Sequence, residues 1–263
     1  MSESAKRIRR RRDAKAQLAR LIDNAENVVV IHYSCESFYD CPNGSSPRIT
    51  SIAVRNLGTG QTTSFSIHQM AERDKKLNAA DIEANYDDLE KKMLRDFYDY
   101  VEMHQGHTWL HWNMRDINYG FPALAHRYKV LGGKPFEFHE SRLCDLARIL
   151  VSMYGVGYAA HPRLASVVAN NKISDLGFLN GEQEAKAFNN REYVKLHQST
   201  LRKVDILANI AERTADGSLK TDARTSEIYG GYFSAITELM REHWVFTLLS
   251  VIGAVASIIA LMR

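Results

Sequence analysis

The sequence predicts a domain of the α/β class, with a mixed sheet flanked by helices, followed by one C-terminal transmembrane helix. A continuous apolar, β-branched segment at residues 27–36 is typical of a central strand covered on both faces. The predicted elements follow the order of three strands, one helix, a fourth strand and then several helices. Strands and helices therefore do not alternate regularly along the chain, which favours a mixed sheet. Residues 244–262 carry no charged side chain and are long enough to cross a bilayer.

Length and charge set the first limits. The 263 residues have room for one sizeable domain and an accessory element. Residues 1–12 hold six Lys or Arg and one Glu, so they contribute +5, and the rest of the chain −2, to the formal net charge of +3. By overall charge, therefore, only this arm is basic, and the body is not a basic nucleic-acid-binding surface, although local basic patches stay open.

The cysteines and the N-terminal residues indicate the cellular compartment and the organisation of the N-terminus. The three cysteines, at positions 35, 41 and 144, form no CxxC pair, which favours a reducing compartment. No apolar run follows the basic N-terminus, so we expect no signal peptide. Residues 1–26 are predicted to be a basic arm running into a helix with apolar residues Ala14, Leu18, Leu21 and Ile22. The arm is either a solvated tail or a contact for lipid headgroups or nucleic-acid phosphates.

The predicted strands come early in the chain. Residues 27–36, 49–56 and 61–68 are rich in β-branched residues or alternate in polarity, and turn formers separate them, which predicts a three-stranded meander. Residues 70–105 are highly charged and helical, with an apolar stripe formed by Leu89, Met93, Leu94, Phe97 and Val101. Later segments predict a strand at 136–139, helices starting near residues 143 and 161, one or two helices within 182–213, and a helix over 225–242.

The stretch Thr108–Tyr128 carries the densest polar chemistry. A short apolar strand, Trp109–Trp112, leads into a turn that contains Asn113 and Asp116. A helix follows, with Pro122 in its first turn, where the amide that proline lacks has no partner. A strand that ends in a polar turn before a helix presents polar groups at one edge of a sheet.

These segments resemble the ribonuclease-H-like fold, and within it the DEDD group of 3′–5′ exonucleases. The strand ending at Ser34 and Glu36 is similar to that group's first motif, a strand that ends Asp-x-Glu. Residues 111–116 resemble the second motif, a strand ending His-Asn followed by an Asp; Asp116 fits, and the Asn is displaced to position 113. The helix over 197–210 is the best candidate for the third motif, with Asp205 as its carboxylate. The likeness spans about residues 27–210.

The resemblance implies a site for two divalent cations, Mg²⁺ or Mn²⁺, which activate water and stabilise the leaving oxygen of a phosphodiester. Its catalytic and metal-binding residues would be Glu36, Asp116 and Asp205. Contacts to phosphate or nucleic acid are expected from Ser34, His111, Asn113, Arg115, Arg202 and Lys203.

The sequence also departs from this pattern. Ser34 replaces the first Asp and removes a ligand that would bridge both metals. Thr200 stands five residues before Asp205, where the commonest subgroup has its general-base His. Arg202 and Lys203 place cations near the expected site, where they would replace a metal or hold phosphate. Three interpretations stay open: a degenerate, non-catalytic domain, a working nuclease, and carboxylates with ordinary structural roles.

The C-terminal segment predicts a single membrane span. Its nineteen uncharged residues, 244–262, reach roughly 28 Å as a helix, the thickness of a hydrocarbon core. Trp244 suits the interface, and Arg241 and Arg263 flank the segment. A buried core helix is the alternative. Small residues spaced four apart, such as Gly253 and Ser257, favour a homo-oligomer through this helix.

The predicted organisation is a basic arm and helix (1–26), an α/β domain (27–215), a helical connector (216–243) and a span (244–262). We expect a single-pass protein of the inner or plasma membrane with its main domain in the cytoplasm. The first functional hypothesis is a degenerate exonuclease-like domain that recognises nucleic acid, a nucleotide or a partner protein at the membrane, an architecture resembling prokaryotic antiviral defence effectors. The alternatives are a membrane-anchored metal-dependent exonuclease and a structural membrane adaptor.

Overall fold

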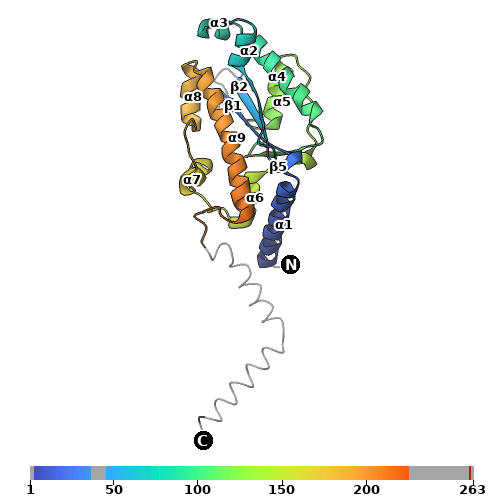
Figure 1. Cartoon of the computed structure of the whole chain (residues 1–263), viewed down its shortest axis with the longest axis vertical. Coiled ribbons are helices and arrows are strands. Elements are labelled where there is room, and N and C mark those ends of the chain that lie inside the picture. Colours follow the sequence, from blue (N-terminus) through green and yellow to red (C-terminus); the bar gives the residue numbers. More distant parts are fainter. Residues whose placement is uncertain (1–2, 37–45, 77, 225–260, 262–263) are drawn as a thin grey trace.

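A computed structural model of the chain describes residues 3–36, 46–76, 78–224 and 261. It contains a five-stranded mixed sheet flanked by helices, so the predicted α/β class is confirmed (Figure 1). The sheet order is β3-β2-β1-β4-β5. The strands are β1 (Val28–Cys35), β2 (Ile49–Asn56), β3 (Thr62–Ser66), β4 (Thr108–His111) and β5 (Leu143–Asp145).

Strand β1 is the centre of the sheet. It pairs antiparallel with β2 on one side and parallel with β4 on the other, and all eight of its residues are buried. Its side chains alternate between two cores, with Val29, Ile31 and Tyr33 in one and Val28 and Val30 in the other. The expectation of a central strand covered on both faces is therefore confirmed.

Helices cover the two cores. The first core takes apolar side chains from α2 (Ile67–Arg73), α3 (Ala79–Ala84), α4 (Tyr86–Met103) and α5 (Phe121–Val130). The second takes them from α1 (Glu3–Asp23), α6 (Leu146–Tyr154), α7 (Arg163–Asn170) and α9 (Tyr193–Asp216). The short helix α8 (Gly181–Asn189) packs on α9. Helix α9 crosses both β1 and β2, and its first turn also reaches the first core.

The basic arm is part of a helix. Helix α1 begins at Glu3, so the arginine run and the predicted apolar face belong to one element. Ala14, Leu18 and Leu21 are buried in the second core, against α6 and α9. The first half of α1 exposes its charges, and ion pairs such as Arg9–Asp13 join successive turns. The face formed by Ala14, Leu18 and Leu21 holds the helix on the domain.

Two predictions about single elements were wrong. Residues 136–139 form no strand, and the fifth strand is instead Leu143–Asp145, where we predicted the start of a helix. Leu143 pairs with Trp109, and Asp145 with His111, in a parallel ladder. The Asp145 side chain accepts the amides of Ala147 and Arg148, so helix α6 begins only at Leu146. A three-residue strand lacks the length that sequence periodicity needs.

The predicted helical region at 70–105 is divided into α2, α3 and α4. Asn78 accepts the amide of Asp81 and starts α3, and Asn85 ends α3 where α4 begins. The predicted apolar stripe is buried on α4. The residues predicted as one or two helices within 182–213 form two, α8 and α9, and the latter continues to Asp216.

The predicted helical connector is wrong in its first part. Residues 217–224 form no helix but return to the domain, where Leu219 is buried and the Asp222 amide donates to the Tyr158 carbonyl. The remainder of the connector and the predicted span, apart from Leu261, lie outside the described residues. Among the described residues no helix combines the length and the apolar character that crossing a bilayer requires.

A buried ion pair joins α4, α5 and β2. Glu90 is fully buried; its carboxylate contacts the Arg127 guanidinium at 2.5 Å and accepts the Ile49 amide at 2.7 Å. Asp87 is a second partner of Arg127, at 2.7 Å. Burial raises the pKa of Glu90 to about 7, while Arg127 and the Ile49 amide act in the opposite direction. Arg127 is thus the group that makes a carboxylate tolerable at this position.

Replacing Arg127 with Met is expected to reduce the free energy of unfolding by about 3–5 kcal/mol, because it leaves Glu90 buried without its cation. Urea denaturation followed by circular dichroism measures the change. The control His126→Ala alters an exposed residue of the same helix and should stay within about 0.5 kcal/mol of wild type. The double variant Glu90→Leu/Arg127→Met should recover much of the loss. Equal stability of the Arg127 and His126 variants would contradict the assignment.

Candidate functional site

Glu36 and Asp116 lie at the same edge of the sheet. They follow β1 and β4, which are parallel and paired from Val28 with Thr108 to Ile31 with His111. The Glu36 carboxylate accepts the Arg48 amide at 3.3 Å. Asp116 is exposed, and one of its oxygens accepts the amides of Asn118 and Tyr119, both at 2.9 Å. The Glu36 carboxylate therefore joins the end of β1 to Arg48, which precedes β2, and Asp116 holds the turn after β4.

Asp205 does not join them. Its carboxylate pairs with Arg55 at 3.2 Å, and Arg55 lies opposite Val30, near the start of β1. Val30 precedes Cys35 by five residues, which is roughly 16 Å along a strand. Arg202 also lies away from Glu36, because its guanidinium donates to the Ser174 carbonyl and lines a small cavity together with Arg55 and Asp205. The predicted convergence of Asp205 and Arg202 with Glu36 is wrong.

Asp205 is far from Glu36 because of the place at which α9 crosses the sheet. Thr200 contacts Ser51 of β2, with 2.7 Å between the hydroxyl oxygens, and Ser51 is the partner of Ser34. One and a half turns later the helix has reached Arg55. The described residues hold no group of three or more His, Cys, Asp or Glu side chains able to bind a metal ion. Glu36, Asp116 and Asp205 therefore do not fit a site for Mg²⁺ or Mn²⁺.

A buried ion pair lies where α8 and α9 cover β1. The Lys203 ammonium contacts the Glu184 carboxylate at 2.7 Å, and each side chain is at most 6% exposed. Ser199 donates to the same carboxylate at 3.1 Å. On β1, burial lowers the pKa of His32, and the positive charge of Lys203 lowers it further. A cation of the protein itself is therefore buried beside the central strand.

Ser34 and Tyr119 complete this buried polar cluster. Ser34 is fully buried, and its hydroxyl has no hydrogen-bond partner among the described residues. The Tyr119 hydroxyl donates to the Tyr33 carbonyl at 3.1 Å and lies 3.2 Å from Nδ1 of His32. Tyr119 thereby connects the loop after β4 with the end of β1. The sequence prediction placed Ser34 and Lys203 in one site, and both lie on the α9 side of the sheet.

A second polar cluster lies at the carboxyl ends of β4 and β5. Asp145 is buried; it pairs with the Arg115 guanidinium at 2.5 Å and accepts the Asn113 amide at 3.2 Å. Asn113 has a positive φ of 57°, a conformation that asparagine tolerates, and its side chain accepts from Arg115. His111 accepts the Met114 amide through Nδ1, at 3.2 Å. The predicted residues His111, Asn113 and Arg115 thus form one cluster.

Asp145 is the residue that the sequence analysis missed. It follows only two strand residues and precedes an apolar helix. The available signal was its position as an Asp directly before a helical pattern, which predicts an N-cap. Recognising β5 would also have placed it beside His111, because parallel strands end at one edge.

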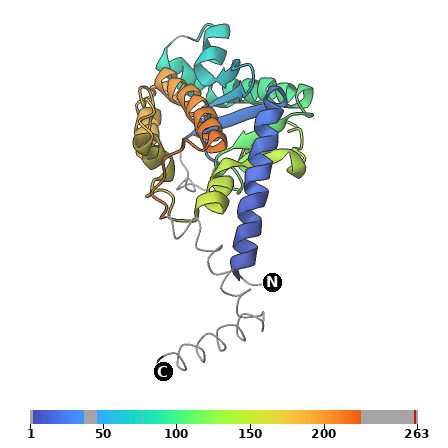
Figure 2. The ribbon, with the colours of Figure 1, turned by 60° about the horizontal axis from the view of Figure 1, so that its bottom comes forward.

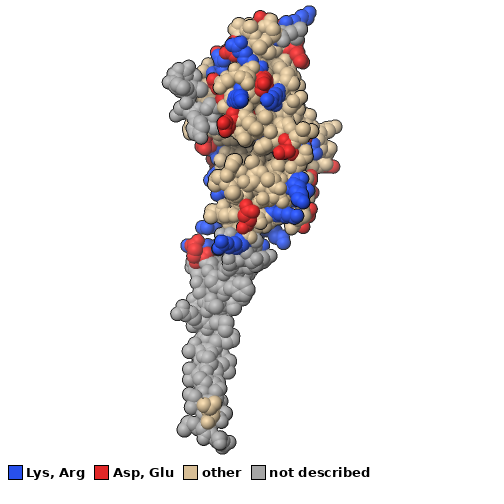
Figure 3. All heavy atoms as spheres, turned by 90° about the vertical axis from the view of Figure 1, so that its left-hand side faces the viewer, with Lys and Arg blue, Asp and Glu red and all other residues tan. Residues whose placement is uncertain are grey.

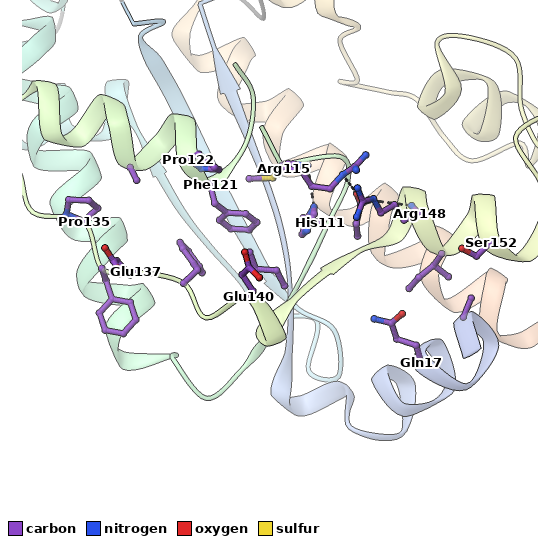
Figure 4. Close-up of a pocket in the computed structure, with 18 of the residues that line it drawn as sticks. Gln17, His111, Arg115, Phe121, Pro122, Pro135, Glu137, Glu140, Arg148 and Ser152 are labelled. Atoms are coloured by element: carbon purple, nitrogen blue, oxygen red, sulfur yellow. Dashed lines mark hydrogen bonds and ion pairs between the residues drawn. The ribbon is translucent and has the colours of Figure 1, made fainter. Parts of the chain in front are cut away.

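A cavity of about 950 Å³ opens beside this second cluster. His111, Arg115 and Asp145 line it from the sheet edge, and Arg148 from α6 (Figure 4). The other walls come from α1, α5 and the segment between α5 and β5. The cavity contains charges of both signs, as does the face in Figure 3, where Lys and Arg are interspersed with Asp and Glu. Its volume and its polar lining, and not a surplus of one charge, make it the candidate site.

His111 is expected to make the domain sensitive to acid. Burial lowers its pKa to about 4, with Asp145 acting in the opposite direction and Arg115 and Arg148 adding to the decrease. The folded pKa lies below the unfolded value of about 6.5, so this contribution to stability is complete above pH 6.5 and is lost as the pH falls towards 4.

When the pH falls from 7 to 4.5, the free energy of unfolding should therefore decrease by about 2–3 kcal/mol less in His111→Gln than in wild type. Urea denaturation at both pH values measures the difference. The control His139→Gln replaces an exposed histidine and should keep the wild-type pH dependence. Parallel pH profiles for wild type and His111→Gln would refute a buried neutral His111.

Comparison of the chain with protein-family models, with curated proteins and with solved structures gives no match.

Proposed function

We propose that the chain is a membrane-tethered receptor domain with a ribonuclease-H-like fold that binds its ligand without metal-dependent cleavage. The ligand is a nucleic acid, a nucleotide or a partner protein, and the protein acts at the membrane in the manner of a prokaryotic defence effector. One observation carries the proposal: the buried Lys203–Glu184 ion pair lies beside the central strand, while Asp205 lies at the other end of it.

The sheet supports the choice of fold. In the order β3-β2-β1-β4-β5, only β2 runs antiparallel to the other strands. This order is compatible with a ribonuclease-H-like sheet. The carboxyl ends of β1 and β4 carry Glu36 and Asp116, as the family resemblance implies.

The charges oppose the exonuclease alternative. Two-metal chemistry needs several carboxylates around two divalent cations. Ser34 supplies no negative charge, Asp205 is engaged by Arg55, and the Lys203 ammonium adds a positive charge next to β1. Lys203 also neutralises Glu184, the buried carboxylate beside β1, so this carboxylate is not free to hold a divalent cation. These charges favour binding without cleavage over the exonuclease.

The positions of the chain ends support membrane tethering. Figures 1 and 2 both place the start of α1 and residues 217–224 at the same end of the molecule. The exposed basic half of α1 therefore lies at the end from which the chain continues towards residues 244–262. Lysine and arginine beside a membrane segment favour contact with anionic lipids.

The full chain is expected to release no nucleotides from labelled single-stranded DNA or RNA in Mg²⁺ or Mn²⁺, because no three acidic side chains converge within the described part of the chain. Gel electrophoresis of the products measures release. Divalent-dependent release that Asp116→Ala abolishes, and the matched loop variant Asn118→Ala retains, would overturn the proposal in favour of the exonuclease.

Two arginines within the predicted span should release the protein from membranes. Each charged residue at the centre of a span costs about 2.5–3.5 kcal/mol on insertion scales, so Ile252→Arg/Val255→Arg should shift the chain to the carbonate-soluble fraction. The matched variant Ile252→Leu/Val255→Leu should stay in the membrane pellet. If wild type is itself carbonate-soluble, the tether is wrong.

A further inference from the structure

We propose that the 950 Å³ cavity beside His111 binds a nucleoside phosphate, with the phosphate on its arginines and the base on its phenylalanine rings. The inference names the ligand of the receptor domain, and it rests on the proposed function in that the ligand is bound and not cleaved. The cavity lies at the β4–β5 edge, separate from the buried Lys203–Glu184 pair.

Arginines define one part of the cavity. Arg148 is exposed in the first turn of α6 and makes no ion pair with the described residues. Arg115 lines the same cavity and is held by Asp145, with 37% of its side chain exposed. Arg10 reaches the cavity from α1, and Lys129 from α5. Guanidinium groups offer paired donors that match the oxygens of phosphate.

Two acids beside these cations do not cancel their positive charge. Asp13 of α1 also lines the cavity, but it is exposed and lies 3.7 Å from both Arg9 and Arg12. Asp145 is 9% exposed, and its carboxylate is already engaged by Arg115 and by the amides of Asn113 and Ala147. It caps α6, so the helix amides do not provide the phosphate site, and the arginine side chains do. His111 is neutral at pH 7 because burial lowers its pKa to about 4.

Aromatic rings define another part of the cavity. Phe136 and Phe138 are half-buried and line it together with Phe121. Phe138 is held by Phe121, with ring centroids 4.4 Å apart, and by Trp109 at 5.1 Å. Such a fixed aromatic wall suits a planar base, because stacking on an aromatic ring contributes to nucleotide binding with little dependence on base identity.

Carboxylates near the rings suit the rest of the ligand. Glu137 and Glu140 are exposed and line the same cavity. In Figure 4, Pro135 and Glu137 lie on the opposite side of the view from Arg148, with Phe121 between them. Carboxylates accept hydrogen bonds from ribose hydroxyls and base amino groups but repel a bare anion. A ligand with an anionic end and a planar, donor-bearing end fits both parts.

Calorimetric titration of the full chain in detergent tests the assignment. The probes are the monophosphates and triphosphates of the four ribonucleosides. Inorganic phosphate and the free nucleosides are titrated separately, because they represent the two halves of a nucleotide. We expect at least one nucleotide to bind about tenfold or more tightly than either half, because both parts of the cavity are then used. Oligonucleotides with and without a 5′-phosphate distinguish a strand end from a free nucleotide.

Two variants separate the two parts of the ligand. Arg148→Ala should weaken nucleotide and phosphate binding about tenfold or more while sparing the free nucleoside. Phe136→Leu, which keeps an apolar side chain, should weaken the nucleotide and the nucleoside while sparing phosphate. Arg142→Ala is the matched control, since Arg142 is an exposed arginine that does not line the cavity. Thermal unfolding verifies that each variant is folded.

Three results would overturn the inference. They are the absence of nucleotide binding at about millimolar concentrations, phosphate binding as tight as nucleotide binding, and unchanged affinity in folded Arg148→Ala. Metal-dependent cleavage of strands would instead overturn the proposed function and leave nucleotide binding by the cavity to be judged on these titrations. The two failures are therefore distinguishable.

Discussion

The burial of β1 on both faces is the constraint from which the rest of the structure follows. A strand in this position gains apolar contacts from two cores, but each polar side chain on it must be accommodated away from water. His32 and Ser34 are such side chains. Around them the fold gathers Tyr119 from the loop after β4 and Lys203 from α9. The central strand thus determines which groups of distant elements lie together.

Two buried ion pairs show how the domain solves the same problem twice. Glu90–Arg127 joins α4 to α5 on one face, and Glu184–Lys203 joins α8 to α9 on the other. A buried pair gains little net stability over apolar residues, but the loss of one partner is costly because the other stays charged. Each carboxylate therefore needs a permanent cation. Lysine and arginine provide that charge from the chain itself. A metal ion would have to bind from solution and would need a defined coordination geometry.

The sequence predicts those features that depend on long, regular patterns. The run at 27–36 and the stripe on α4 are long enough for their periodicity to identify a buried strand and a helix face. Glu36 and Asp116 could be placed at one edge because both follow parallel strands. Asp205 could not be placed, since its position depends on where α9 crosses β2, and no residue pattern reports that crossing. Asp145 was missed because a three-residue strand exists only through its pairing with β4.

Helix α1 connects the cavity with the end of the molecule where we propose the membrane tether. Ala14 and Leu18 hold it on the domain, while Arg10 and Gln17 line the cavity. A ligand that contacts Arg10 gains that contact only when α1 is packed on the domain. Its affinity therefore depends on the packed position of this helix. The same arginine run is the segment that anionic lipid would attract. If both proposals hold, ligand binding and lipid contact would act on the same helix, which is the physical requirement for coupling them.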